Sequence, residues 1–153
     1  MLRFRKLKES DLSKTDWSAE PLTALLPAGA DYIPQHLAAG DTIFVIFEEG
    51  KPIGLLEMDA QTVGEKPRCA VIGYAVILPD CRRRGLGRML MTLAAGEAVE
   101  RQIWFLAGSV PQEETAQRFA DAVHFRMTEW FETLRVLDLS DVEGLRYGNR
   151  QHT

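Results

Sequence analysis

One stretch of the chain, residues 71–90, joins a strand signal to a helix signal through a turn rich in arginine and glycine. Residues 71–78 are nearly all apolar and many are β-branched or aromatic, which predicts a strand buried on both faces. Pro79 has no backbone N–H and ends that strand. Apolar residues then recur at helical spacing from Leu86, which predicts a helix over about 84–100. This succession favours an α/β architecture.

The turn itself has the features of an anion site. Arg82, Arg83 and Arg84 place three positive charges beside the start of the helix, where backbone N–H groups lack intrahelical partners and the helix dipole is positive. Gly85 and Gly87 are poor helix formers that leave the main chain open to a ligand. The pattern predicts a phosphate or pyrophosphate site. The alternative is a solvated basic turn before an ordinary amphipathic helix.

The spacing of these residues distinguishes among phosphate-binding motifs. A P-loop needs a Lys-Ser/Thr pair where this chain has Arg88-Met89, and the dinucleotide fingerprint needs glycine where Leu90 stands. The pattern Arg82-x-x-Gly85-x-Gly87 instead resembles the (Q/R)-x-x-G-x-G/A signature of the GNAT family of N-acetyltransferases. In that family this segment follows the fourth strand and binds the pyrophosphate of acetyl-CoA. The resemblance covers about residues 2–139.

The order of the other predicted elements is similar to that of the same family. Strands are predicted at 2–8, 42–47, 52–58, 102–107, 125–130 and 133–139, with a hairpin turn at Gly50, short helices at 12–17, 21–26 and 31–39, and a helix at about 113–123. The resemblance implies an α/β fold with a mixed, mostly antiparallel central sheet, splayed at its middle and covered by helices on both faces. We expect one acetyl-CoA-binding domain over 1–153, with a loosely packed tail from about 141.

The resemblance also implies which residues hold acetyl-CoA. Main-chain groups of the central strand would hold the pantetheine arm, and the turn and first helical residues would surround the pyrophosphate. The implied cofactor-binding residues are Ala75, Val76, Ile77, Arg82, Arg83, Arg84, Gly85, Leu86, Gly87 and Arg88.

Catalytic residues are less evident in the sequence. Direct attack of a neutral amine on the thioester requires a group that removes the ammonium proton. Glu57, at the end of the third strand, and Tyr74, on the central strand, are the predicted base or relay, although a surface carboxylate and a packing tyrosine would look the same. The tyrosine that often protonates the thiolate in this family corresponds to Ala120 here. The general acid is therefore not identified.

Other residues fall in the segment that walls the acceptor pocket in this family. Trp17, Tyr32 and His36 lie there and could select an amine, although core packing explains Trp17 equally well. The acceptor itself is not evident from these residues. Pairing of two chains through edge strands into a homodimer is left open.

Composition narrows the range of partners. A net charge of −4 disfavours a nucleic-acid partner, including the charged transfer RNA on which some toxins of the family act, and leaves room for a cationic amine. Two cysteines and three scattered histidines predict neither a disulfide framework nor a metal site. The N-terminus lacks the apolar core of a signal peptide, and no apolar run is long enough for a membrane span. We expect a cytoplasmic, metal-free protein.

These observations predict an acetyl-CoA-dependent N-acetyltransferase that acts on a primary amine of a small molecule, peptide or protein. The absent tyrosine leaves a second hypothesis, a catalytically weak acetyl-CoA sensor or regulatory binding module. A third is a plain α/β domain with a fortuitous basic turn. Binding of acetyl-CoA with release of free thiol in the presence of an amine separates the three.

Overall fold

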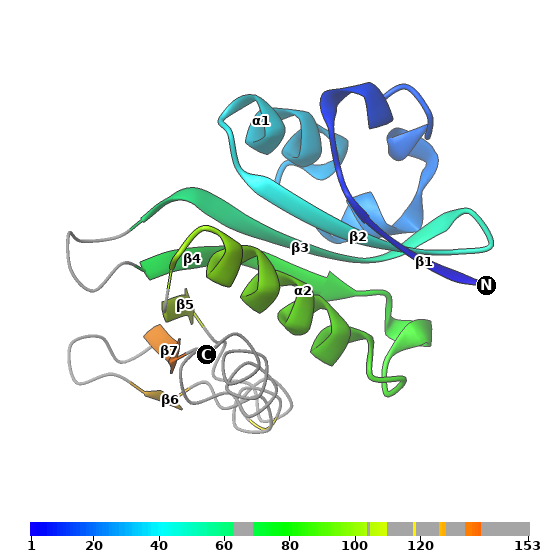
Figure 1. Cartoon of the computed structure of the whole chain (residues 1–153). Coiled ribbons are helices and arrows are strands. Elements are labelled where there is room, and N and C mark those ends of the chain that lie inside the picture. The colour runs from blue at the N-terminus through cyan, green and yellow to red at the C-terminus, as the bar shows by residue number, and fades with distance from the viewer. Residues whose placement is uncertain (63–68, 104, 110–117, 119–125, 128–133, 139–153) are drawn as a thin grey trace. The chain divides into compact units, whose positions relative to one another are not determined.

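The computed structural model in Figure 1 describes residues 1–62, 69–103, 105–109, 118, 126–127 and 134–138. The chain divides into two compact units. The first comprises Met1–Gln61 and Gly73–Ala94, and the second comprises Thr62–Ile72 and Ala95–Thr153. Strand β4 (Cys69–Ile77) and helix α2 (Leu86–Glu100) each contribute to both units.

The first unit is built on strands in the order β1 (Leu2–Lys6), β2 (Thr42–Glu48), β3 (Lys51–Thr62) and the second half of β4. Both β1 with β2 and β2 with β3 pair antiparallel. The predicted hairpin turn is confirmed: Glu49 and Gly50 connect β2 to β3, with φ of 50° and 79°. Two positive φ values are typical of the type I′ turn, whose twist matches the flanking strands.

The second unit adds β5 (Phe105–Ser109), β7 (Leu134–Asp138) and β6 (Arg126–Met127) to the first half of β4. β5 pairs parallel with β4 and antiparallel with β7. The parallel ladder runs only from Cys69 and Phe105 to Ile72 and Gly108. The second half of β4 lies beyond this ladder, which is where the expected splay would begin. The mixed, mostly antiparallel sheet predicted from the sequence is confirmed.

The segment between β1 and β2 contains less α-helix than the sequence predicted. Helix α1 (Tyr32–Ala38) lies where a short helix was expected. The other turns are 3-10 helices: η1 (Glu9–Asp11), η2 (Trp17–Ala19), η3 (Pro21–Leu25) and η4 (Gly29–Asp31). The prediction of a helix at 12–17 was therefore wrong, and that at 21–26 was right in position but not in helix type. Such short segments cannot offset the cost of nucleating an α-helix, so tertiary packing decides their form.

Element boundaries differ by a few residues elsewhere. β3 continues to Thr62, four residues beyond the predicted end. Its pairing with β2 ends at Met58, which lies opposite Thr42 at the start of β2, so the last four residues extend past β2. α2 begins at Leu86 instead of residue 84. The predicted helix at 113–123 and the tail from 141 lie outside the described residues.

The core of the first unit uses both faces of β2 and β3, which run between α1 and α2 in Figure 1. Ile43, Val45 and Leu55 pack with Tyr32 and Ile33 of α1. Side chains that alternate with these, including Phe44, Ile46, Leu56 and Met58, are also buried. α2 contributes its own buried stripe of Leu86, Leu90, Met91 and Ala94. No helix in the described residues is long and apolar enough to span a membrane.

Candidate active site

The turn between β4 and α2 exposes the start of a helix. A 3-10 turn, η5 (Pro79–Cys81), follows β4, and positive φ at Arg83 (64°) and Gly85 (78°) reverses the chain into α2. The Met89 N–H donates to the Gly85 carbonyl. The N–H groups of Leu86, Gly87 and Arg88 precede this first helical bond and have no intrahelical acceptor. Three donors and the positive end of the helix dipole are thereby offered to an anion.

The arginines before α2 are exposed, and two of them are held by protein groups. The Arg82 Nε donates to the Ile77 carbonyl at 3.2 Å. Both guanidinium nitrogens of Arg84 contact the carboxylate of Glu48, one of them at 3.1 Å. Hydrogen bonding to Arg84 lowers the pKa of Glu48. Arg83 and Arg88 stay exposed at the surface of the turn and helix.

The second half of β4 leads into this turn. Ala75 is exposed, Val76 is partly buried in the core of the first unit, and Ile77 carries the carbonyl that accepts from Arg82. The implied pantetheine-binding residues therefore lead along the chain directly into the turn that carries the implied pyrophosphate-binding residues.

The carboxyl group of Glu57 lies buried beside the same half of β4. Glu57 is 2% exposed, on the face of β3 that packs against α1. Its Oε2 accepts a hydrogen bond from the Tyr32 hydroxyl at 3.0 Å. A Cβ atom built on Gly73 would come within 2.0 Å of this same oxygen. The carboxyl group therefore occupies space that only a glycine at position 73 leaves free.

Helix α1 brings two side chains to Glu57. Tyr32 and His36 are one helical turn apart and share a face, with ring centroids 4.0 Å apart. His36 Nδ1 lies 3.3 Å from Glu57 Oε1. The family resemblance had assigned both residues to the acceptor pocket, and the structure places them against the predicted base.

Asp41 joins this group because of the way α1 ends. Gly40 has φ of 88°, its N–H donates to the Leu37 carbonyl, and the Asp41 N–H donates to the His36 carbonyl, both at 3.0 Å. These two bonds form the Schellman motif that commonly ends helices at glycine. The reversal leaves Asp41 Oδ2 2.7 Å from His36 Nδ1. Sequence reasoning missed Asp41, and the glycine directly after a short helix was the signal that could have found it.

Electrostatics in this group favour a titration of Glu57 near neutral pH. Burial raises the pKa of Glu57 to about 7, and the Asp41 carboxyl adds to the rise, against the opposite effects of Tyr32 and His36. Burial also raises the pKa of Tyr32, and the Glu57 charge contributes. Tyr32 therefore stays protonated, and its hydroxyl donates a hydrogen bond to the Glu57 carboxylate. A buried carboxyl that is partly ionised at neutral pH can act as a general base.

Tyr74, the other predicted catalytic residue, lies close by with its hydroxyl engaged. Its O–H donates to the Leu25 carbonyl at 2.8 Å, and its ring centroid is 6.0 Å from that of Tyr32. Tyr32 therefore lies near both predicted catalytic residues, Tyr74 and Glu57. The hydrogen bond ties η3 to β4.

His36, Asp41 and Glu57 also place potential ligand atoms within 4.8 Å of one another. Hydrogen bonds account for this spacing, since His36 Nδ1 lies within 3.3 Å of an oxygen of each carboxyl. The absence of a metal remains a prediction from the sequence, which loss of activity on chelation would contradict.

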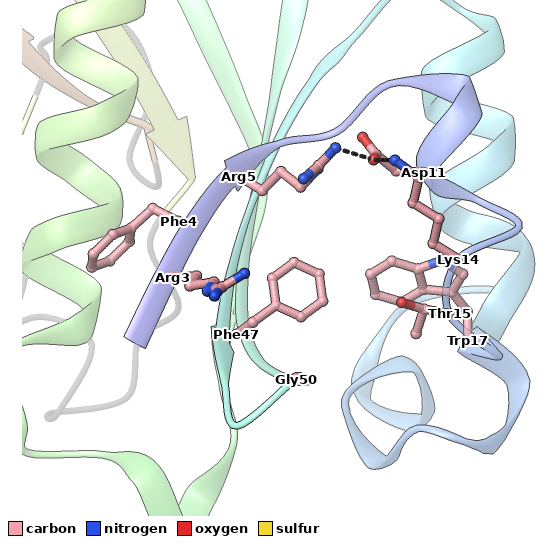
Figure 2. Close-up of a pocket in the computed structure, with 9 residues that line it drawn as sticks. All are labelled: Arg3, Phe4, Arg5, Asp11, Lys14, Thr15, Trp17, Phe47 and Gly50. Carbon is pink, nitrogen blue, oxygen red and sulfur yellow. Dashed lines mark hydrogen bonds and ion pairs between the residues drawn. The ribbon is translucent and has the colours of Figure 1, made fainter. Parts of the chain in front are cut away.

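A separate recess of about 240 Å³ opens between β1, the β2–β3 hairpin and the turns after β1 (Figure 2). Arg5 and Lys14 lie 2.6 and 3.4 Å from the buried Asp11 carboxylate, and hydrogen bonds from Arg5 and the Lys8 N–H lower the pKa of Asp11 to about 2. Trp17 lines this recess, 6.1 Å from Phe47 between ring centroids. The structure places Trp17 here, and not in contact with Glu57. Ala120, at the predicted tyrosine position, lies outside the described residues.

Comparison with known proteins gives a consistent result. The model of the acetyltransferase (GNAT) family matches residues 7–125. No protein in the curated set matches the sequence.

Solved structures with a similar fold include three of recognised activity or ligand. The ribosomal-protein-S18-alanine N-acetyltransferase from Escherichia coli has a TM-score of 0.69 at 17% identity, over 93% of this chain and 96% of that chain. AAC(6')-Iy, in complex with the bisubstrate analogue CoA-S-monomethyl-acetylneamine, has a TM-score of 0.69 at 18% identity, over 86% and 95%. A mutant AtaT toxin bound to the C-terminus of the antitoxin AtaR and acetyl-CoA has a TM-score of 0.68 at 16% identity, over 95% of this chain and 97% of that chain. At such identities the likeness shows the fold.

Proposed function

The chain belongs to the acetyltransferase (GNAT) family, and on that premise we propose that it transfers the acetyl group of acetyl-CoA directly to a primary amine of a small molecule, a peptide or a protein. The observation that carries this proposal is the position of Glu57. A buried carboxyl with a pKa of about 7 lies against Gly73, one residue past the end of the parallel ladder. It is therefore next to the strand segment that would hold the thioester.

The residues present fit acetyl-CoA. Ala75 is exposed, the first N–H donors of α2 have no intrahelical acceptor, and a Cβ built on Gly85 would meet no atom within 4 Å, so the turn is open. In this proposal Ala75, Val76 and Ile77 hold the pantetheine arm. The first turn of α2 and the arginines before it hold the pyrophosphate. Acetyl-CoA would supply the activated thioester.

The protein groups would then prepare the acceptor. Glu57 takes one proton from the acceptor ammonium, which leaves a neutral amine with a free electron pair. Tyr32 donates a hydrogen bond to the Glu57 carboxylate and orients it. Of the two predicted catalytic residues we therefore propose Glu57 as the base and Tyr74 as a wall of the acceptor site, because the Tyr74 hydroxyl donates to Leu25.

The site and the similar structures together indicate the chemical class of the acceptor. The similar structures include an enzyme named for a protein alanine and one bound to a bisubstrate analogue of an aminoglycoside type. The Glu57 carboxyl, with the side chains of Tyr32 and Tyr74 nearby, suits a primary ammonium group of either class. We propose a primary amine, and a panel of polyamines, aminoglycosides and peptides with free N-termini would narrow the class.

Glu57→Gln tests the role of the base. We expect kcat to fall by roughly 100- to 10,000-fold, since a positioned base contributes about that much, while acetyl-CoA affinity stays unchanged. Release of free thiol with an acceptor amine measures the rate, and calorimetric titration measures the affinity. Glu9→Gln, which removes an exposed carboxylate in η1, is the matched control. An unchanged kcat in Glu57→Gln would exclude Glu57 as the base.

Binding of acetyl-CoA without thiol release from any amine would instead favour the sensor hypothesis. The two functions share the cofactor surface and differ in the use of Glu57. No binding of acetyl-CoA would contradict both.

A further inference from the structure

Glu57 is surrounded by groups that affect its proton in opposite ways. Among the described residues, the polar side chains at the Glu57 carboxyl are Tyr32 and His36 from α1 and Asp41 from the turn before β2. The ring of Tyr74 in β4 lies 6.0 Å from that of Tyr32. Tyr32 donates to one oxygen and His36 Nδ1 approaches the other. Both contacts stabilise the ionised carboxylate.

Asp41 has the opposite effect. It carries the same charge as Glu57, and a hydrogen bond between the two carboxyls forms only when one of them holds a proton, so Asp41 favours the protonated form of Glu57. Asp41 is fixed in place by the His36 Nδ1 contact at 2.7 Å and by the Schellman turn at Gly40. Its position therefore does not depend on a substrate.

Exposure of these side chains forms a gradient toward solvent. The side chain of Glu57 is 3% exposed, that of Asp41 is 12% exposed and that of His36 is 34% exposed. The Glu57 side chain thus has very little exposed surface, whereas those of Asp41 and His36 have more. Of the three side chains at the Glu57 carboxyl, Asp41 and His36 are therefore the two that we expect to exchange its proton with solvent.

We propose that Asp41 and His36 are positioning residues for Glu57: Asp41 stabilises the proton that Glu57 takes from the acceptor amine, and His36 favours its release toward solvent. The inference rests on the proposed function. In the forward step the ammonium loses one proton, its N–H electron pair stays on nitrogen, and the Glu57 carboxylate becomes a carboxyl group. In the return step that proton passes through Asp41 to water, and Glu57 is a carboxylate again.

The test is a pair of substitutions with opposite expected signs. In Asp41→Asn the titration midpoint of Glu57 should fall by about one pH unit, because a like charge and a proton acceptor are lost. In His36→Gln it should rise by a similar amount, because the imidazole no longer favours the carboxylate. NMR titration of the ¹³C-labelled Glu57 carboxyl in the intact protein reports both midpoints without any need for activity. Asp31→Asn, an exposed aspartate at the start of α1, is the charge-matched control.

A purely structural role would give a different result. Loss of packing would hydrate Glu57 in both variants and move both midpoints down toward its ordinary value of 4.5. Shifts of the same sign, or no shift, would overturn the proposal. A lower midpoint in Asp41→Asn and a higher one in His36→Gln would support it, provided that the acidic limb of the kcat/KM profile moves in the same directions.

The same experiment separates this inference from the proposed function. Opposite NMR shifts without acetyl transfer to any amine would contradict the proposed function and still support the coupling of Asp41 and His36 to Glu57. Acetyl transfer with a pH profile that neither substitution changes would contradict the inference and leave the proposed function intact.

Discussion

Glycine at position 73 determines where the carboxyl group of Glu57 can lie. β4 passes so close to β3 here that a Cβ atom would come within 2.0 Å of Glu57 Oε2 and 3.0 Å of its Cδ. Gly73 does not have a positive φ, so the backbone itself would accept alanine. Its importance is therefore spatial. The missing side chain leaves room for the group that we propose as the base.

We expect Gly73→Ala to displace the Glu57 carboxyl from Tyr32 and His36. Displacement of a reacting group by about 1 Å lowers kcat/KM by roughly 10- to 100-fold. The affinity for acetyl-CoA should stay within about twofold of its native value. Steady-state kinetics and calorimetry measure the two effects. Gly96→Ala is the control, because a Cβ at Gly96 of α2 meets no atom within 4 Å. Unchanged kinetics in Gly73→Ala would show that the position of this carboxyl is not important for the reaction.

The C-terminal end of α1 and the N-terminal end of α2 position the groups that we propose for function. α1 ends at Gly40, and the resulting turn carries Asp41 to His36. α2 begins after Gly85, and its first N–H groups have no intrahelical acceptor. The ion pair of Arg84 with Glu48 joins this turn to the end of β2. In each case a glycine with positive φ turns the chain. A residue with a Cβ atom would be strained at that φ.

The start of α2 should be necessary for tight binding of acetyl-CoA. Arg83→Glu combined with Arg84→Glu, or Gly87→Leu alone, should weaken acetyl-CoA binding at least tenfold, because charged hydrogen-bond donors or access to the N–H groups are lost. Thermal stability should change little, since the arginines are exposed and surface ion pairs contribute little. Calorimetric titration and a melting curve measure the two quantities. Lys8→Glu controls for charge. Native affinity in both variants would contradict the pyrophosphate site.

The whole molecule should respond to pH through its two most perturbed carboxyl groups. The pKa of Asp11 is lowered to about 2 from 3.8, so the stability that it contributes is present above about pH 4 and is lost as the pH falls toward 2. The pKa of Glu57 is raised to about 7 from 4.5. The folded protein then binds more protons than the unfolded chain between these values, so stability falls as the pH rises from about 4.5 to 7.

Glu57→Gln tests this pH dependence. The free energy of unfolding of the native protein, relative to the variant, should fall between about pH 4.5 and 7, with a slope of at most about 1.4 kcal/mol per pH unit for one group. Urea denaturation at several pH values measures it. A difference that does not vary with pH would show that Glu57 titrates normally in the folded state. Asp11 remains in both proteins and cancels in the comparison.

The sequence by itself determined the parts of this protein that depend on local physics. The apolar run at 71–78, Pro79 and the two glycines predicted the strand, its end and the start of α2, since each acts through the backbone next to it. The Glu49-Gly50 turn predicted the hairpin in the same way, whereas the fold and the family were implied by the resemblance at Arg82-x-x-Gly85-x-Gly87. Glu57 and Tyr74 were found as candidates because they fall at recognisable points of predicted strands.

Only the tertiary structure decided which side chains meet. Tyr32, His36 and Asp41 are 25, 21 and 16 residues before Glu57 in the sequence, and no local rule brings them to it. Their meeting depends on α1 lying on one face of β3 and on the turn at Gly40. The same packing gave 3-10 turns where the sequence predicted α-helix, because segments so short take their form from what they cover. Burial then raised the pKa of Glu57, and burial is a property of the folded chain.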